Sequence, residues 1–253
     1  MSDQTYPVGA VRTSFTIIEA LREAGTAGVT ELAEKTGISK GSVHKHLTTL
    51  RSLGYVVKED TSYSLGYRFL GLGCRMRDRS ELFRIARPAI DNLADTSGAI
   101  VNLIVPEQGY GIYLYRAGDS AAVQGYLPTI GERIYLHATA GGKAILSQLP
   151  REAVETIIET TGLPKLTAKT TTDPDELFAM LRSVRDRELA FERGEHLPSV
   201  QCVAAPITTE DGPIGAVSVS GSIDTMSGKK LEEDLAGLVI STANEIELQL
   251  FSQ

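Results

Sequence analysis

The stretch SKGSVHKHLTTLRSLGYVVK, residues 39–58, gives the clearest indication of structure in the first third of this chain. It holds four lysines or arginines, two histidines and no acidic residue, although the formal net charge of the 253-residue chain is −7. Its apolar side chains recur every three or four positions, as on one face of an α-helix, and are Val43, Leu47, Leu50 and Leu53. The opposite face presents Ser42, Lys45, His46 and Thr49. A helix that buries one side and offers cations and hydrogen-bond donors on the other is typical of DNA recognition.

The residues on either side of this stretch predict two more helices and a hairpin. One helix is expected over residues 8–24, with a buried stripe made of Val11, Phe15, Ile18 and Leu21. A second helix is expected from Thr30 as its N-cap to Gly37, and a third from Ser39 as its N-cap to about Leu53. Strands at 55–59 and 63–65, joined by a turn, then form a wing. This order predicts a winged helix-turn-helix.

Charge divides the chain in the same place. Residues 1–79 carry a formal charge of +3, and the remaining 174 residues carry −10. A basic first part can neutralise phosphates, whereas an acidic second part would be repelled by them. We therefore expect two modules with different partners.

The overall composition indicates a folded protein of the cytoplasm. The chain is 42% hydrophobic and 23% charged, and no apolar run approaches the roughly 20 residues of a membrane span. The first ten residues lack the layout of a secretion signal, so we expect a cytoplasmic protein with no membrane partner. Cys74 and Cys202 lie in different modules, which makes a disulfide between them improbable.

The rest of the chain predicts an α/β module with a mostly antiparallel sheet. A linker helix is expected at 67–79, then a helix capped by Ser80 that runs to about Thr96 and is kinked or restarted at Pro88. Strands are expected at 99–105, 111–116, 123–127, 133–136, 202–207 and 214–221, with a turn at 211–213 between the last two. Helices are expected at 140–148, 151–160, 173–187 and 228–250.

Several motifs resemble those of IclR-type transcriptional regulators. The first helix, VRTSFTIIEAL from Val11, and the segment TGISKGSVHKHL from Thr36 carry the resemblance in the first module. The wing follows with Gly54-Tyr55 and Tyr63-Ser64-Leu65-Gly66. The second module shows HATAGGKA from His137, Glu195 followed by CVAAPI from Cys202, and AVSVSG from Ala216. Ser199 stands where the family usually has glycine, so the path of residues 195–201 is less well defined by the resemblance.

The resemblance covers about residues 8–250 and implies a fold and a function. The expected fold is α+β, with a winged helix-turn-helix DNA-binding domain (1–66), a linker helix (67–80) and a GAF-like effector-binding domain (81–253). The expected function is sequence-specific DNA binding modulated by a small-molecule effector, with no enzymatic activity and no cofactor. The expected partners are a double-stranded DNA operator, the effector, and further copies of the chain as a homodimer or dimer of dimers.

Two sets of residues are expected to carry these functions. The DNA-binding set is Ser39, Lys40, Ser42, His44, Lys45, His46, Thr49, Arg51 and Lys58. The effector-binding set, carried over from the resemblance, is Thr139, Ala140, Gly141, Cys202, Ser218 and Ser220, together with Glu192 at a position where the family often has an acid.

The residue types of the effector-binding set are suited to a carboxylate. Thr139-Ala140-Gly141-Gly142 opens a helix, and the free N–H groups at a helix N-terminus attract an anion. Ser218 and Ser220 alternate on one strand, so both hydroxyls face the same side. We therefore predict a small polar pocket for a carboxylate metabolite.

Other readings of the second module stay open from sequence alone. Cys202 can pair with His137 or His196 as a catalytic thiol–imidazole pair, or join His196 and Glu195 in a zinc site. Cys202 is also a candidate redox sensor, and Cys74, close to Arg75 and Arg77, is a candidate reactive thiol. In these cases the protein would be a metabolite-binding, catalytic, zinc-sensing or redox-sensing protein, and its first module an interaction domain.

Overall fold

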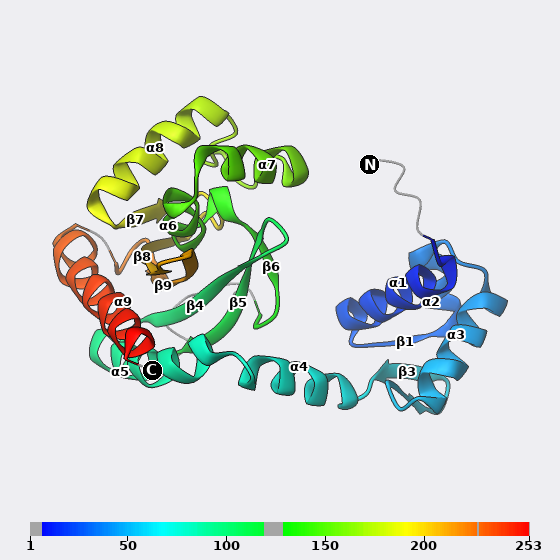
Figure 1. The fold of residues 1–253 in the computed structure, drawn as a ribbon. Helices are drawn as coiled ribbons and strands as arrows, with labels where there is room; N and C mark the ends of the chain where they lie inside the picture. The colour runs from blue at the N-terminus through cyan, green and yellow to red at the C-terminus, as the bar shows by residue number, and fades with distance from the viewer. Residues whose placement is uncertain (1–6, 119–128, 227, 253) are drawn as a thin grey trace. The chain divides into compact units, whose positions relative to one another are not determined.

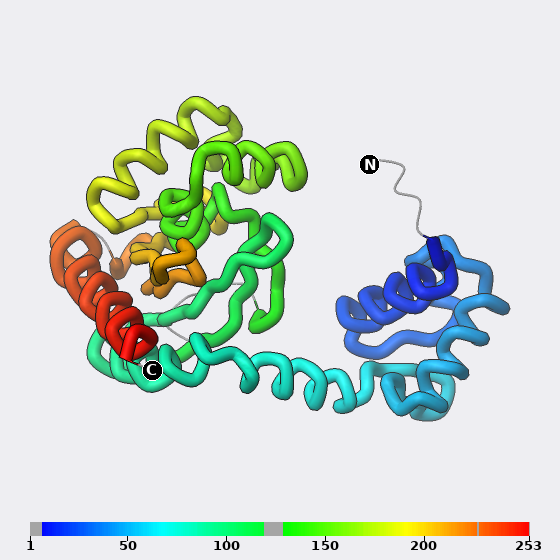
Figure 2. Tube along the Cα trace, viewed as in Figure 1, coloured from blue at the N-terminus to red at the C-terminus, as the bar shows by residue number. Residues whose placement is uncertain are grey.

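The computed structural model describes residues 7–118, 129–226 and 228–252. Contacts between residues divide the chain into two units, residues 1–76 and 77–253. Figures 1 and 2 show the path of the chain through both. Each unit has its own hydrophobic core, and each is described by itself.

The first unit contains three helices, a three-stranded antiparallel sheet and most of a further helix, α4. The elements are α1 (Gly9–Ala24), β1 (Thr26–Gly28), α2 (Val29–Thr36), α3 (Lys40–Ser52), β2 (Val56–Glu59), β3 (Ser62–Leu65) and α4 (Arg68–Asp78). The sheet has the order β1-β3-β2, and β2 and β3 form the expected wing. The winged helix-turn-helix is thus confirmed.

Helix α3 begins where the sequence predicted. The Ser39 hydroxyl accepts a hydrogen bond from the Ser42 backbone N–H at 3.3 Å, which satisfies one of the free donors of the first turn. The start of α2 was predicted wrongly, because Gly28 and not Thr30 precedes its first residue, Val29. The residues before α2 instead form β1, which pairs with β3.

The predicted buried stripe of α1 is confirmed at Ile18 and Leu21 and was wrong at Val11 and Phe15. Val11 is 53% exposed and Phe15 is 57% exposed, whereas Ile17, Ile18, Ala20 and Leu21 are buried. On α3, Val43, Leu47 and Leu50 are buried as expected, but Leu53 is 52% exposed. The core of this unit therefore lies against the second half of α1, and its first half leaves apolar side chains in solvent.

The second unit is built on a six-stranded antiparallel sheet with the order β6-β5-β4-β9-β8-β7. Its strands are β4 (Ile100–Glu107), β5 (Tyr110–Ala117), β6 (Arg133–Tyr135), β7 (Ala190–Arg193), β8 (Val200–Thr209) and β9 (Gly212–Ser222). Its helical elements are α5 (Glu81–Ser97), η2 (Leu136–Ala138), α6 (Ala140–Gln148), α7 (Arg151–Thr161), α8 (Pro174–Arg187), η3 (Lys230–Leu235) and α9 (Ala236–Phe251).

Helices cover both faces of this sheet (Figure 1). Side chains of α5, η3 and α9 form one core with the sheet, and side chains of α6, α7 and α8 form a second core on the other face. The sheet is central, so polar side chains on its strands are enclosed. This arrangement confirms the α+β fold.

Several details of the second unit differ from the sequence prediction. Strand β7 was not predicted, because Ala190–Arg193 includes two charged residues and no clear apolar alternation. Helix α5 continues through Pro88 without restarting. The last predicted helix divides into a π-helical turn, η3, and α9. The 211–213 turn lies one residue earlier, since β9 already starts at Gly212. The predicted strand at 123–127 falls outside the described residues.

None of the helices that the structure describes combines the length and apolar character needed to cross a membrane.

The start of α6 packs against the preceding chain so closely that only glycine fits. A Cβ atom on Gly142 would overlap the backbone of Leu136, whose atoms cannot move aside as a flexible side chain would. A Cβ atom on Gly237, near the start of α9, would meet nothing within 4 Å. Packing therefore requires glycine at position 142, whereas it leaves room for a larger residue at position 237.

Replacing each glycine by alanine should consequently change stability in opposite directions. Gly142→Ala is expected to lower the free energy of unfolding by roughly 1–3 kcal/mol, as overpacking does. Gly237→Ala is expected to raise it by about 0.5–1 kcal/mol, through higher helix propensity and a less flexible unfolded chain. Denaturant unfolding of both variants tests this, and equal changes in the two would contradict the packing argument.

Candidate functional site

A buried pocket lies between the N-terminus of α6, the middle of the sheet and the segment that links β7 to β8. All seven residues of the predicted effector-binding set line it: Thr139, Ala140, Gly141, Glu192, Cys202, Ser218 and Ser220. The structure brings together residues that are up to 81 positions apart in sequence. Sequence reasoning did not assign the other lining residues to this pocket, although it had named His196 as a possible partner of Cys202. They are Asn102, Ile104, Tyr113, Arg116, His196, Leu197 and Val200.

The serine hydroxyls on β9 are arranged as donors toward the pocket. The Asn102 side-chain amide donates to Ser220 Oγ at 3.3 Å and to Ser218 Oγ at 3.5 Å. The Cys202 thiol also donates to Ser220 Oγ, at 3.2 Å. Because both hydroxyl oxygens already accept hydrogen bonds, their O–H groups remain to donate to a ligand. Both serines are buried, and both face the pocket as their alternation predicted.

Arg116 supports Asn102 from the neighbouring strand. Its Nε donates to Asn102 Oδ1 at 2.7 Å, and its guanidinium lies 5.2 Å from the centroid of the Tyr113 ring. The amide orientation of Asn102 is thereby fixed, with its NH2 group toward the serines. Asn102 was visible in the sequence as the one polar residue in an otherwise apolar strand, 99–105.

The N-terminus of α6 supplies backbone donors to the same space. Thr139 is the N-cap, and its hydroxyl accepts from the Gly142 N–H at 3.1 Å. The N–H groups of Ala140 and Gly141 open the helix, where an α-helix has no acceptor of its own for them. These donors and the positive end of the helix dipole favour an anion in the pocket.

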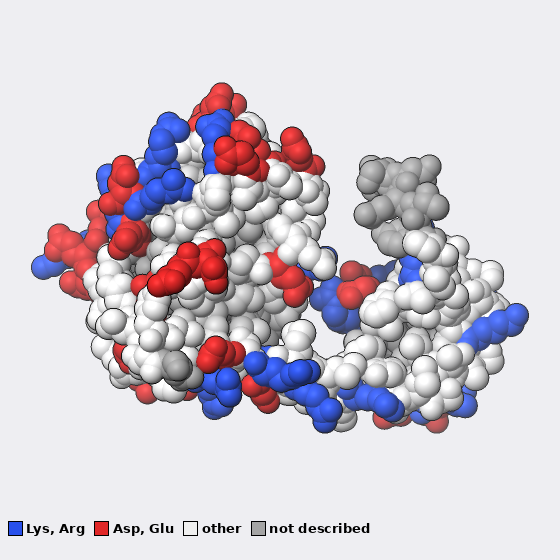
Figure 3. Space-filling view, viewed as in Figure 1, with Lys and Arg blue, Asp and Glu red and all other residues white. Residues whose placement is uncertain are grey.

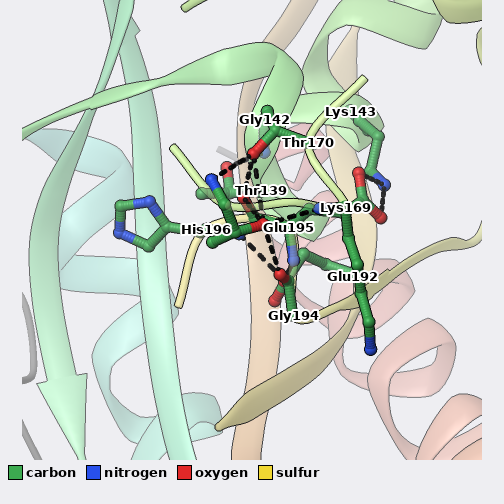
Figure 4. Close-up of polar contacts among 10 residues, drawn as sticks. Thr139, Gly142, Lys143, Lys169, Thr170, Glu192, Gly194, Glu195 and His196 are labelled. Atoms are coloured by element: carbon green, nitrogen blue, oxygen red, sulfur yellow. Dashed lines mark hydrogen bonds and ion pairs between the residues drawn. The ribbon is translucent and has the colours of Figure 1, made fainter. Parts of the chain in front are cut away.

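We call residues 194–199, which close one side of the pocket, the strap. Strap backbone groups are held by threonines of an earlier loop: Thr170 Oγ1 donates to Glu195 O at 2.6 Å, and Thr167 Oγ1 donates to Gly194 O at 2.7 Å. The Glu192 carboxylate accepts from the backbone N–H of Glu195 and, at 3.1 Å, from that of His196. Burial raises the Glu192 pKa, while these two backbone hydrogen bonds act in the opposite direction. Figure 4 shows the contacts.

A buried ion pair ties the strap to α6. Lys143 Nζ lies 2.7 Å from Glu195 Oε1 and 2.8 Å from Oε2, and the two side chains are 3% and 15% exposed. Ser199, where the family usually has glycine, does not have a positive φ angle. Its side chain therefore does not strain the strap, and the path of residues 195–201 accommodates it.

The pocket is small. It holds about 440 Å³ of space between atoms, its mouth included, but the centre of a water molecule can move within only about 20 Å³ of it. A ligand of several heavy atoms must therefore displace side chains or the strap.

The thiol and the imidazoles do not form a catalytic pair. Burial, followed by the Glu192 charge, raises the pKa of the Cys202 thiol well above its ordinary value, so the thiol stays protonated. His137 Nε2 donates to Pro164 O at 3.2 Å, and burial lowers the His137 pKa. Over the described ranges, no three His, Cys, Asp or Glu side chains lie close enough to hold a metal ion. The geometry thus gives no support to the catalytic and zinc readings.

The predicted DNA-binding residues lie mainly on the outer side of α3 and on the wing. Ser39, Lys40, His44, Lys45, Thr49, Arg51 and Lys58 are exposed, and Ser42 and His46 are half-buried. His46 is turned toward α1, because its Nδ1 forms a 2.8 Å hydrogen bond with Ser14 Oγ. Thr48, which is also exposed beside Lys45, was missed by sequence reasoning.

Basic side chains also line α4, as Figure 3 shows along the segment that Figure 1 labels. Arg68 and Arg75 are exposed on this helix, and Arg79 is exposed directly after it. Arg77 instead places its guanidinium 4.5 Å from the centroid of the Phe83 ring.

Two family models match the chain. Residues 10–60 match the IclR helix-turn-helix domain, and residues 74–248 match the bacterial transcriptional regulator IclR C-terminal domain. Among curated relatives, the probable HTH-type transcriptional regulator ArcR of Halobacterium salinarum is 30% identical over 248 residues, which is 96% of this chain and 94% of ArcR. The transcriptional repressor IclR of Escherichia coli is 30% identical over 238 residues, 92% of this chain and 86% of that protein.

Solved structures agree with these matches. The crystal structure of Thermotoga maritima IclR superimposes with a TM-score of 0.80 at 26% identity, covering 96% of this chain and 98% of that one. An IclR homolog from Microbacterium hydrocarbonoxydans, solved in complex with 4-hydroxybenzoate, gives a TM-score of 0.81 at 20% identity, covering 96% of this chain and 100% of that one. The curated relatives are regulators of transcription, not enzymes. The chain belongs to the IclR family of transcriptional regulators.

Proposed function

We propose that this regulator reads its operator with α3 and the wing, and that a small carboxylate bound in the pocket of the second unit alters its affinity for DNA. The single observation that carries the effector half is that all seven predicted residues line one buried pocket at the N-terminus of α6. The proposed division is a DNA-binding domain at 1–66, a linker at 67–80 and an effector-binding domain at 81–253. Since an operator must be reached, the proposed location is the cytoplasm.

On the DNA side, Lys45 and Thr48 lie opposite the buried face of α3, so their side chains are best placed to enter the major groove. Lys40 and Arg51 lie at the two ends of the helix, where they can contact phosphates. Lys58 on the wing lies 5.7 Å from the centroid of the Tyr63 ring and extends the basic surface. His46 would act by holding α3 against α1 rather than by reaching the bases, because its ring is bound to Ser14.

On the effector side, the pocket offers the Ser218 and Ser220 hydroxyls and the first N–H groups of α6 as donors. A carboxylate accepts hydrogen bonds only, so it matches this set better than a neutral or cationic group does. The IclR homolog that binds 4-hydroxybenzoate supports a carboxylate as the ligand class. Effector and DNA would be coupled reciprocally, each changing the affinity for the other by the same factor.

Assembly into a homodimer, or a dimer of such dimers, is part of the proposal. Val8, Val11 and Phe15 recur on one side of α1 and are 57%, 53% and 57% exposed. Such an exposed apolar stripe, on a helix whose other side packs into the core of the first unit, is suited to contact a second copy of the chain. A dimer also doubles the area of the DNA interface. The interface of one recognition helix alone is too small for operator selectivity.

Removing the charge of Lys45 should weaken DNA binding and its dependence on salt. Lys45→Ala is expected to lower affinity roughly tenfold and to reduce the slope of log K against log salt by about one. Fluorescence anisotropy on a duplex selected by the parent protein from a random-sequence library measures both. Lys35→Ala is the control, since Lys35 lies on α2 and its Nζ is paired with Glu23 at 2.8 Å. An unchanged slope for Lys45→Ala would place the DNA interface elsewhere.

Removing the two pocket hydroxyls should abolish effector binding. Thermal unfolding of the parent is expected to shift upward with one or more short or aromatic carboxylic acids, because a ligand that binds only the folded state stabilises it. The Ser218→Ala/Ser220→Ala variant should show no shift. Ser222→Ala, at the end of the same strand and outside the pocket, should respond as the parent does. Absence of any shift in the parent would contradict the carboxylate pocket.

Polar substitution of the α1 stripe should reduce the oligomeric mass. Val11→Ser/Phe15→Ser is expected to lower the molar mass measured by light scattering at a given concentration without loss of fold, since both residues are exposed. Ile130→Ser, an exposed apolar residue of the second unit, is the control. A double variant with the mass of the parent assembly would show that α1 does not form the interface.

A further inference from the structure

His196 has no role in the pocket as described, and both of its ring nitrogens are buried. Nδ1 and Nε2 have no hydrogen-bond partner among the described residues. In that part of the chain, they are the buried side-chain nitrogen or oxygen atoms for which this is so. The residue nevertheless lines the pocket, beside Leu197. Buried polar atoms are almost always paired in folded proteins, so two unpaired atoms on one ring indicate a missing partner.

The backbone of His196 is held firmly beside the pocket. The His196 N–H donates to Glu192, and the preceding residue is held through Lys143, Thr170 and the Glu192 carboxylate. In Figure 4 the imidazole points away from this cluster of contacts. The strap thus fixes the backbone from which the ring projects and leaves the ring nitrogens without partners in the part of the chain that the structure describes.

The imidazole is suited to a neutral polar group rather than to a second anion. Burial lowers the His196 pKa, against a smaller opposite effect of Glu132, so the ring is neutral near neutral pH. A neutral imidazole has one N–H donor and one acceptor nitrogen. A hydroxyl can satisfy either nitrogen, and a carbonyl oxygen can satisfy the N–H.

We infer that His196 is a specificity-determining residue that binds a second polar group of the effector, so that the ligand is a carboxylic acid bearing a hydroxyl or carbonyl group. This rests on the proposed function of the pocket, since the carboxylate itself is assigned to the serines and the α6 N-terminus. A site built to hydrogen-bond such a group discriminates strongly against the analogue that lacks it, because its own buried polar atoms are then left unpaired.

The inference is tested by His196→Phe, with His196→Gln as the variant that restores a donor and an acceptor. His137→Phe is the matched control: His137 belongs to the same unit, does not line the pocket, and has its Nε2 bound to Pro164 O. The probes are acid pairs that differ by one polar group, namely propionate with lactate or pyruvate, and benzoate with 4-hydroxybenzoate. Thermal unfolding and calorimetric titration measure stability and affinity.

Two results are expected. First, ligand-free His196→Phe should melt at or above the temperature of the parent, because it removes unpaired buried atoms, whereas His137→Phe should melt lower. Second, the parent should bind the hydroxy- or oxo-acid of a pair more tightly, and His196→Phe should lose that preference with a roughly tenfold drop in affinity, about 1.4 kcal/mol. His196→Gln should retain part of the preference.

Other results would overturn it. If His196→Phe kept the parent's affinity and preference, or if its ligand-free melting temperature fell as far as that of His137→Phe, the ring would be structural. That outcome leaves the effector pocket standing, because the parent still binds the acids and Ser218→Ala/Ser220→Ala does not. If no acid bound to the parent, the proposed pocket would fail, and the inference with it.

Discussion

The ion pair between Lys143 and Glu195 is the contact on which the pocket depends. It joins the first turn of α6, which supplies backbone donors, to the strap, which supplies one wall. Removing one partner of such a pair would leave the other charge buried, without a counter-charge and without water, which is strongly destabilising. The position of α6 and that of the strap are therefore set together.

The hydrogen bonds around the pocket also explain how it can select among ligands. Lys143, Glu195 and the threonines satisfy the strap, and Asn102 and Cys202 supply donors to the serines. Almost every buried polar atom of the pocket is thus used within the protein, and the groups left over are mostly donors. A site in this condition distinguishes ligands by charge and by hydrogen-bonding pattern more than by shape.

Sequence reasoning found those parts of the structure that depend on local chemistry. Ser39 was identified as a cap because its hydroxyl serves the next residues of its own helix, and α6 was bounded correctly from Thr139 and its glycines. Ser218 and Ser220 were placed on one side of a strand by the period of two. Family resemblance, rather than spacing, brought Glu192 and Cys202 to the same pocket.

The errors arose where long-range packing overrides local pattern. Val11 and Phe15 have helical spacing with Ile18 and Leu21, but the buried side chains of α1 lie in its second half, and Val11 and Phe15 remain exposed. Thr30 is a suitable N-cap residue when only the local sequence is considered. In the structure, β1 pairs with β3 and ends at Gly28, and α2 starts directly after it at Val29. Tyr113 and Arg116 could not be assigned, since only the sheet order, in which β4 lies between β5 and β9, brings them near the serines of β9. His196 had been considered only as a partner of Cys202. Nothing in the sequence near His196 indicates that its ring lacks a partner.

The small volume of the pocket affects the rates at which a ligand binds and leaves rather than its affinity. Because a water molecule has only about 20 Å³ in which its centre can move, a larger ligand enters only when the walls open. Its association rate is then set by the frequency of opening and falls below the rate of diffusional encounter. Release requires the same opening, so the frequency of opening limits dissociation as well. If the pocket holds the effector as proposed, a regulator whose walls open slowly responds to the sustained level of that effector and not to changes briefer than one opening.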